Sequence, residues 1–216
     1  MPFQSREQAA HLIAKKLASY KGKNPLVLGI PRGAVPMAKI IADTLNGELD
    51  IVLVHKLGAP GQPELAIGSI DETGNVYLSD YVRDLGISAE YVNTEKQAQL
   101  ETLLTRRARF TPLRPPIDPT GRTVIVVDNG IATGATMIAA LRAVRAQNPA
   151  KLIAAVAVAP PSTLKRMENE ADEVVCLEAP LHFYAVGEFF EDFSQVSDED
   201  VIKILRQSNV KAAATT

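Results

Sequence analysis

Residues 124–136, VIVVDNGIATGAT, combine acidic chemistry with a bend rich in glycine and threonine. An apolar run ends on Asp128 and Asn129, and the residues after the bend, IATGATMIAAL, do not alternate as a returning strand would. Glycines allow backbone N–H groups to turn inward, threonines add hydroxyl donors, and the N-terminal end of a following helix attracts anions. We therefore predict a phosphate cradle at Ala132, Thr133, Gly134, Ala135 and Thr136.

The alternative for this segment is that Asn129 and Gly130 form only a type I′ hairpin turn. The cradle has neither the lysine of a P-loop nor the G-x-G-x-x-G spacing of a dinucleotide fold, so the pattern does not favour ATP or NAD. Asp128 directly precedes the cradle, where a carboxylate can accept hydrogen bonds from sugar hydroxyls or from metal-bound water.

A second strand-to-helix corner has the same design. LGIPRGAVP, residues 28–36, places Arg32 and Gly33 in a bend between an apolar strand and a helix start. Arginine offers a fixed fork of donors that suits phosphate, and glycine permits close backbone approach. The alternative for Arg32 is a solvated surface arginine. Two such corners suit a ligand with an anionic group at each end.

These corners need an α/β scaffold to position them. We predict strands at 26–30, 50–54, 123–127, 151–159 and 173–177, a hairpin of 65–70 with 75–79, and helices at 4–20, 36–45, 88–109, 137–147, 162–171 and from Ser197. Alternating strands and helices predict a mostly parallel central sheet flanked by helices. Residues 56–64 are expected to lack regular structure, 112–121 to form a Pro-rich connector, and 209–216 to fray.

Composition narrows the class of protein. With 216 residues and 46% apolar content, the chain is expected to form one domain, residues 1–216. Lys and Arg (23) nearly balance Asp and Glu (25), so we expect no nucleic-acid partner. The longest apolar run, 152–159, is shorter than the roughly 20 residues of a membrane span. The lone Cys176 and an N-terminus without signal-peptide character predict a cytoplasmic protein with no membrane partner.

Residues 124–136 resemble the phosphoribosyl-pyrophosphate (PRPP) motif of type I phosphoribosyltransferases, in which apolar residues lead to two acidic residues and a T-G-x-T turn. The segments LGIPRGAVPMA, HKLGAPGQPELAIGSI and VGEFFEDFSQVSDEDV are similar to stretches of a bacterial phosphoribosyltransferase family whose acceptor is unassigned. The resemblance covers most of the chain. It implies the type I fold, with a C-terminal hood and helix region at 182–207 and a flexible loop or hairpin.

The resemblance also implies an enzyme that transfers the phosphoribosyl group of PRPP to a small nitrogenous, nucleobase-like acceptor and releases pyrophosphate. The cradle at 132–136 would bind the 5′-phosphate, Asp128 and Asn129 the ribose, and Arg32, Gly33 and Lys56 the pyrophosphate. Asp128 and Lys56 are the expected catalytic residues. Mg²⁺ is the expected cofactor, held near Asp128 through PRPP and water without a direct protein ligand. A homodimer is a further possibility.

Three features leave alternatives open. The loop GAPGQPE resembles a mobile lid but equally suits an ordinary connection, and His55 either binds phosphate when protonated or packs. Five aromatics lie within 183–193, and the resemblance makes Phe183 and Tyr184 candidates for acceptor contact; core packing or a subunit interface is the alternative. Ala132 stands where enzymes for 6-oxopurines have an acid, which disfavours such an acceptor.

Asn129 departs from the motif, which usually has an acidic residue at this position. An amide keeps an acceptor but removes a charge that would support a cationic sugar, so Asn129→Asp is expected to tighten binding of Mg-PRPP. The departure favours, as an alternative function, a PRPP- or nucleotide-binding regulator with lost or weak transferase activity. A hydrolase of phosphorylated sugars or nucleotides is a third reading.

Overall fold

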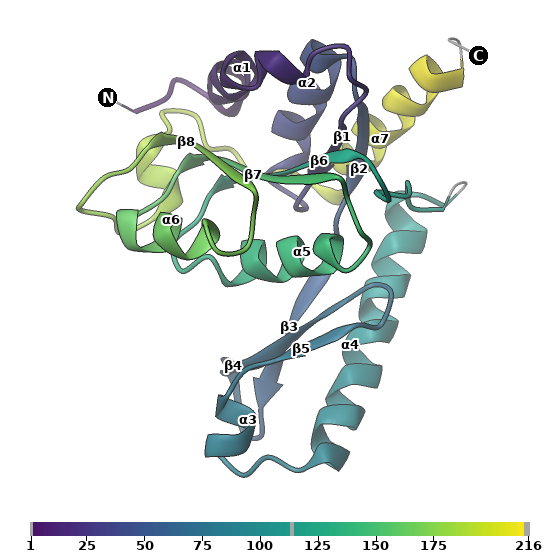
Figure 1. The fold of residues 1–216 in the computed structure, drawn as a ribbon, viewed down its shortest axis with the longest axis vertical. Coiled ribbons are helices and arrows are strands. Elements are labelled where there is room, and N and C mark those ends of the chain that lie inside the picture. The colour runs from purple at the N-terminus through teal and green to yellow at the C-terminus, as the bar shows by residue number, and fades with distance from the viewer. Residues whose placement is uncertain (1, 113–114, 214–216) are drawn as a thin grey trace.

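Five parallel strands and three antiparallel strands organise the chain. The strands are β1 (Leu26–Gly29), β2 (Glu48–Ile51), β3 (Val54–Ala59), β4 (Gln62–Asp71), β5 (Val76–Leu78), β6 (Thr123–Gly130), β7 (Lys151–Val158) and β8 (Glu173–Glu178). The computed structural model describes residues 2–112 and 115–213. The parallel sheet has the order β2-β1-β6-β7-β8, and the smaller sheet the order β3-β4-β5 (Figure 1). The predicted fold class is confirmed.

Helices cover both faces of the parallel sheet. On one face lie α1 (Arg6–Lys16) and α2 (Val35–Leu45), and on the other α5 (Ala135–Arg145) and α6 (Pro161–Met167). Helices α3 (Tyr81–Asp84) and α4 (Ala89–Phe110) lie with the smaller sheet, and α7 (Asp198–Ala213) packs against α2 and β2 (Figure 1). Short 3₁₀ helices occur at Ala18–Tyr20 and Val186–Phe189. Ser88 caps α4 as predicted, because its hydroxyl accepts the N–H of Tyr91 at 3.2 Å.

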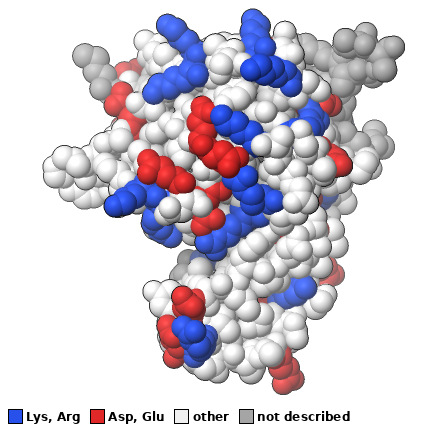
Figure 2. All heavy atoms as spheres, in the orientation of Figure 1, with Lys and Arg blue, Asp and Glu red and all other residues white. Residues whose placement is uncertain are grey.

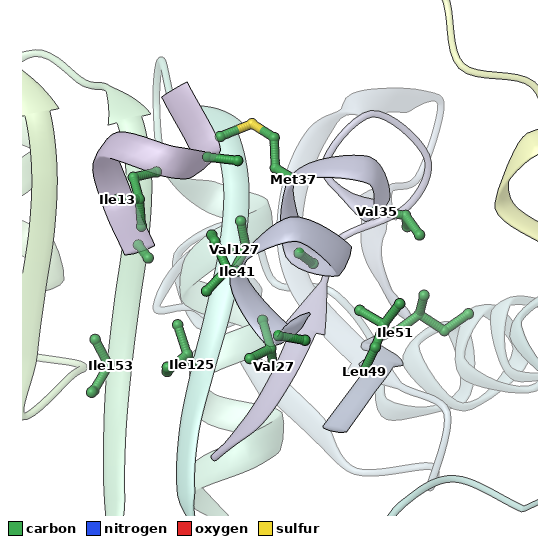
Figure 3. Packing of buried hydrophobic residues seen from close by; sticks show 14 of the residues in the cluster. Ile13, Val27, Val35, Met37, Ile41, Leu49, Ile51, Ile125, Val127 and Ile153 are labelled. Carbon is green, nitrogen blue, oxygen red and sulfur yellow. The ribbon is translucent and has the colours of Figure 1, made fainter. Parts of the chain in front are cut away.

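The core follows the two-residue period of the strands. Val27, Ile125 and Val127 point to the face covered by α1 and α2, where they pack with Ile13 and Ile41 (Figure 3). The alternate strand residues point to the opposite face; they include Leu26, Leu28, Val124 and Val126. There they pack with Met137 and Leu141 of α5 and with Met167 of α6. Burial on both faces explains why these strands are continuous apolar runs.

The small sheet and α4 form an arm that extends from the central sheet (Figure 1). Its apolar residues, among them Leu57, Ile67 and Leu103, belong to the same buried cluster as Val27 and Ile125 of the central sheet. This continuity supports the expectation of one domain, which stays a prediction. Figure 2 shows charges of both signs interspersed over the face of the central body, whereas the arm carries few on that face.

Two sequence predictions in this region are wrong. Residues 50–54 are not one strand, because β2 ends at Ile51 and the chain leaves the sheet before β3 begins at Val54. Val52 and Leu53 are buried between β2 and β3, so the apolar run in the sequence extends beyond the end of β2. Residues 56–64 were expected to be irregular, but they form the end of the β3–β4 hairpin.

Turn chemistry explains the second correction. Ala59 pairs with Gln62, so Pro60 and Gly61 are the two residues of the turn, and Gly61 has a φ of 70°. The proline and the glycine therefore join two strands instead of interrupting them. The hairpin of β4 with β5 is confirmed.

The C-terminal region also differs from expectation. Helix α7 continues to Ala213, although 209–216 was expected to fray; residues 214–216 lie outside the described part of the chain. Lysine and alanine at 211–213 are good helix formers, which favours the longer helix. Within the described residues, none of the helices combines the length and the apolar character that a membrane crossing needs.

Candidate functional site

The two predicted corners lie side by side. β1 and β6 are neighbours in the parallel sheet, and Gly29 pairs with Val127, so the segments after both strands leave the sheet at the same edge. A Cβ atom at Gly33 would stand only 2.4 Å from Nδ2 of Asn129. A larger residue at position 33 would therefore force the Asn129 side chain to move.

A pocket of about 670 Å³ opens where these corners meet. Its walls come from both corners, from the N-terminus of α1, from α4 and from the segment before α7. The lining residues are Arg6, Pro31, Arg32, Gly33, Arg106, Asn129, Phe193, Gln195, Val196 and Asp198. The peptide bond between Pro31 and Arg32 is cis. Three arginines and a single carboxylate give this lining a positive excess that suits an anionic ligand.

Arg32 is half exposed and is not a purely solvated side chain. Its Nη1 lies 3.5 Å from Oδ1 of Asp198, at the start of α7. The same carboxylate pairs with Arg109 at 2.7 Å. One aspartate thus serves two arginines, which leaves Arg32 with donors available to a ligand.

Asp128 is unusual among the acidic side chains. Burial raises the pKa of its carboxyl to about 7, and the N–H of Asn129, which donates to Oδ1 at 2.7 Å, lowers it only in part. The residue keeps partial access to solvent. Its carboxylate is therefore poised to ionise near neutral pH, or earlier when a cation or a hydroxyl donor binds beside it.

The predicted phosphate cradle forms the N-terminus of α5. Gly134 is its N-cap with a φ of 77°, and the N–H groups of Ala135 and Thr136 lie in the first turn, before helical hydrogen bonding begins. Helix α6 holds the loop from behind, because Thr163 Oγ1 donates to the Ala132 carbonyl at 2.6 Å. Arg166 Nη1 donates to the next carbonyl, that of Thr133, at 3.0 Å.

The remaining predicted site residues are not part of the 670 Å³ pocket. The cradle residues and Asp128 do not line it, and Lys56 is exposed on β3. Phe183 stacks on Phe189 with ring centroids 5.3 Å apart, and Tyr184 is 84% exposed. The aromatic residue that does line the pocket is Phe193. Roles for Lys56, Phe183 and Tyr184 stay predictions.

Sequence reasoning missed Arg6 and Arg106. Arg6 lies on α1, and its Nε donates to Oδ1 of Asn129 at 3.2 Å, across 123 positions of sequence. Arg106 lies on α4, next to the buried Arg107. Both occur among helix-favouring polar residues, and no local pattern distinguishes them from solvated arginines. Only the packing of their helices brings them to the pocket.

Replacing Gly33 with alanine is expected to weaken binding of an anionic ligand in this pocket about tenfold, a change of about 1.4 kcal/mol. The added methyl group would overlap Nδ2 of Asn129, so that side chain must turn away and lose its hydrogen bond from Arg6. Calorimetric titration with Mg-PRPP, the ligand that the sequence resemblance implies, measures the effect. A urea unfolding curve within about 1 kcal/mol of the parent chain would show that the loss is local. Unchanged affinity would contradict the close-approach argument.

The fold and the pocket define an α/β protein with an arginine-rich pocket at the edge of its parallel sheet. The family model "Phosphoribosyl transferase domain" matches residues 4–193. "Putative phosphoribosyl transferase Rv0571c" of Mycobacterium tuberculosis H37Rv is 42% identical over 208 residues, 96% of this chain and 47% of that protein. A protein of strain CDC 1551 with a corresponding name matches equally. The chain belongs to the phosphoribosyl transferase domain family, which confirms the resemblance.

The structural comparison supports the same scaffold. The crystal structure of TT1426 from Thermus thermophilus aligns with a TM-score of 0.86 and 43% identity, covering 96% of this chain and 99% of that one. The chain spans about half the length of the curated Mycobacterium relatives that it matches.

Proposed function

We propose that this chain binds Mg-PRPP and transfers its phosphoribosyl group to a small nitrogenous acceptor with release of pyrophosphate. The observation that carries the proposal is the juxtaposition of the two corners, with Gly33 and Asn129 in contact distance beside three arginines. PRPP has a phosphate at one end and a pyrophosphate at the other, so a binding site needs two anion positions flanking a ribose. The bend at 31–33 and the cradle at 132–136 supply them.

In this proposal each corner has one task. The first turn of α5 holds the 5′-phosphate with backbone N–H groups, and Arg32 holds the pyrophosphate with its guanidinium. Asp128 lies near the end of β6, just before the cradle, and accepts hydrogen bonds from ribose hydroxyls. Its negative charge also stabilises the positive charge that develops on the sugar as the bond from C1 to pyrophosphate breaks. Positioning and charge, without a protein nucleophile, supply the rate enhancement.

Magnesium fits the donors that the chain offers. Mg²⁺ prefers oxygen ligands and keeps several waters, and a partly accessible carboxylate such as Asp128 can accept hydrogen bonds from those waters. When bound, the ion would neutralise charge on the leaving pyrophosphate. Lys56, on β3, is the proposed further contact to pyrophosphate, and Phe183 with Tyr184 are the proposed acceptor contacts. Cytoplasmic location and a homodimer complete the proposal.

Pyrophosphate release from Mg-PRPP is the direct test. We expect release with one class of nitrogen base or amine in a panel of acceptors, little release without an acceptor, and about 100-fold less with Arg32→Ala. Arg83→Ala, which removes an exposed ion pair between Arg83 and Asp80 on the arm, is the matched control and should behave as the parent chain. Release without any acceptor would indicate a hydrolase. Binding of PRPP with no release in any condition would indicate a regulator.

A further inference from the structure

Arg6 is held in place by three neighbours in the pocket. Its Nε donates to Oδ1 of Asn129 at 3.2 Å, and its Nη1 donates to the backbone carbonyl of Ser194 at 2.8 Å. Its guanidinium carbon lies 4.0 Å from the centroid of the Phe193 ring. A guanidinium fixed on an aromatic face and by two acceptors loses little further freedom when it binds a ligand.

The charge of Arg6 has no close carboxylate to neutralise it. Among the described residues, no aspartate or glutamate lies within ion-pair distance of Arg6, although Asp192 attracts it from farther away. Arg32, by contrast, shares Asp198 with Arg109. Neutral acceptors, the Asn129 amide and the Ser194 carbonyl, hold the Arg6 fork. The side chain is thus oriented as it would be in an ion pair, while its positive charge stays available.

Arg6 reaches the bend that follows β1. Its Nη2 lies 3.8 Å from the position that a Cβ of Gly33 would occupy, and both residues line the same pocket as Arg32 and Arg106. An anion bound against the backbone at Gly33 would therefore lie within reach of the Arg6 fork. This bend is where the proposed function puts pyrophosphate, the more highly charged end of PRPP.

We propose that Arg6 is a pyrophosphate-binding residue and that Asn129 is its positioning residue. The inference rests on the proposed function for the identity of the anion. It also gives a physical reason for the amide at position 129. An aspartate there would accept the same hydrogen bond but would neutralise Arg6, whereas an amide holds the arginine without cancelling its charge. Asn129→Asp should therefore weaken pyrophosphate binding, the reverse of what the motif alone suggests.

The test uses inorganic pyrophosphate without added metal as the probe, because it has no ribose and so isolates this end of the site. Calorimetry would compare the parent chain with Arg6→Gln, Asn129→Ala, the double variant and Asn129→Asp. We expect about tenfold weaker binding for Arg6→Gln, as for loss of one charge-assisted contact, and about threefold for Asn129→Ala. The double variant should match Arg6→Gln, since Asn129 acts through the arginine. Asn129→Asp should weaken binding about tenfold.

Two further variants separate charge from folding. Arg83→Gln removes an exposed arginine on the arm and should bind as the parent chain does. Arg6→Lys keeps the charge and should recover most of the affinity lost in Arg6→Gln. Thermal unfolding would verify that each variant is folded.

The inference is overturned if Arg6→Gln binds pyrophosphate within about twofold of Arg83→Gln, or if Asn129→Asp binds it more tightly than the parent chain. It is also overturned if the folded parent chain does not bind pyrophosphate. Failure of the proposed function has a different signature, namely no pyrophosphate release from Mg-PRPP with any acceptor. The two results are obtained independently.

Discussion

Asp128→Asn is expected to stabilise the ligand-free protein at pH 8. The ordinary pKa of an aspartate is 3.8, and burial raises that of Asp128 to about 7 in the folded chain. Between these values the unfolded chain has released the proton that the folded chain retains, so stability is full below the lower pKa and is lost as pH rises through the higher one. At about 1.4 kcal/mol per pKa unit, the cost at pH 8 is on the order of 4 kcal/mol. Replacing Asp128 with asparagine removes this cost, because the amide does not ionise.

Thermal unfolding at pH 5 and pH 8 measures this effect. The variant should gain roughly 8–16 °C over the parent chain at pH 8, since about 1 kcal/mol shifts the midpoint by roughly 2–4 °C in a chain of this size. The gain should be smaller at pH 5. Asp172→Asn is the control with the opposite sign, because a hydrogen bond from Arg145 holds the pKa of Asp172 below its usual range. Equal midpoint shifts at both pH values would refute the burial argument for Asp128.

The same substitution is expected to reduce turnover of Mg-PRPP by about 100-fold or more, because an uncharged amide cannot stabilise a cationic sugar. For the parent chain, kcat/KM for Mg-PRPP should rise with pH through about 7 as the carboxyl of free Asp128 ionises. The variant's residual activity should lack that rise. A gain of stability together with a loss of activity would show that this carboxylate is kept for chemistry at a cost in folding.

Arg107→Ala is expected to destabilise the protein by about 3–5 kcal/mol. Arg107 of α4 is 8% exposed, and its Nη1 lies 3.0 Å from Oδ1 of Asp50, which is 1% exposed. Its Nη2 donates to the carbonyl of Ile51 at 2.8 Å, and both Nε and Nη2 donate to Glu72, just beyond β4. Removal would leave a buried aspartate without its arginine. Urea unfolding gives the free-energy change directly.

Two comparisons sharpen this prediction. Arg109→Ala should cost less than about 1 kcal/mol, because Arg109 and Glu199 are exposed and Asp198 is only half-buried. Arg107→Leu combined with Asp50→Asn should recover only part of the loss, because the buried side chain at position 50 then carries no charge while Glu72 still lacks its arginine. If Arg107→Ala proved as stable as Arg109→Ala, the buried cluster would not be what joins α4 to the ends of β2 and β4. Because Arg106 neighbours Arg107, pocket binding should weaken together with stability.

Local signals in the sequence were sufficient for the central scaffold. Strands such as 123–127 are apolar throughout because helices cover both faces, and the glycine bend after Asp128 marks where the strand ends and α5 begins. Ser88 at the start of α4 is a local capping signal that the structure confirms. The arm was harder to predict. The pattern APGQ is compatible with a loop or a hairpin turn, and pairing with β4 decided between them.

By itself, the sequence determined the α/β class, the family and the two corners at Arg32 and at 128–136, since each depends on residues close together in the chain. Tertiary structure alone decided that these corners adjoin, through the pairing of β1 with β6. It also brought Arg6 to Asn129 and placed Arg106 and Phe193 in the pocket, while Phe183 and Tyr184 lie outside it. The physical reason is that such contacts join segments distant in sequence. The packing of helices on a shared core fixes these contacts, and the local sequence around an arginine does not indicate that it will reach the pocket.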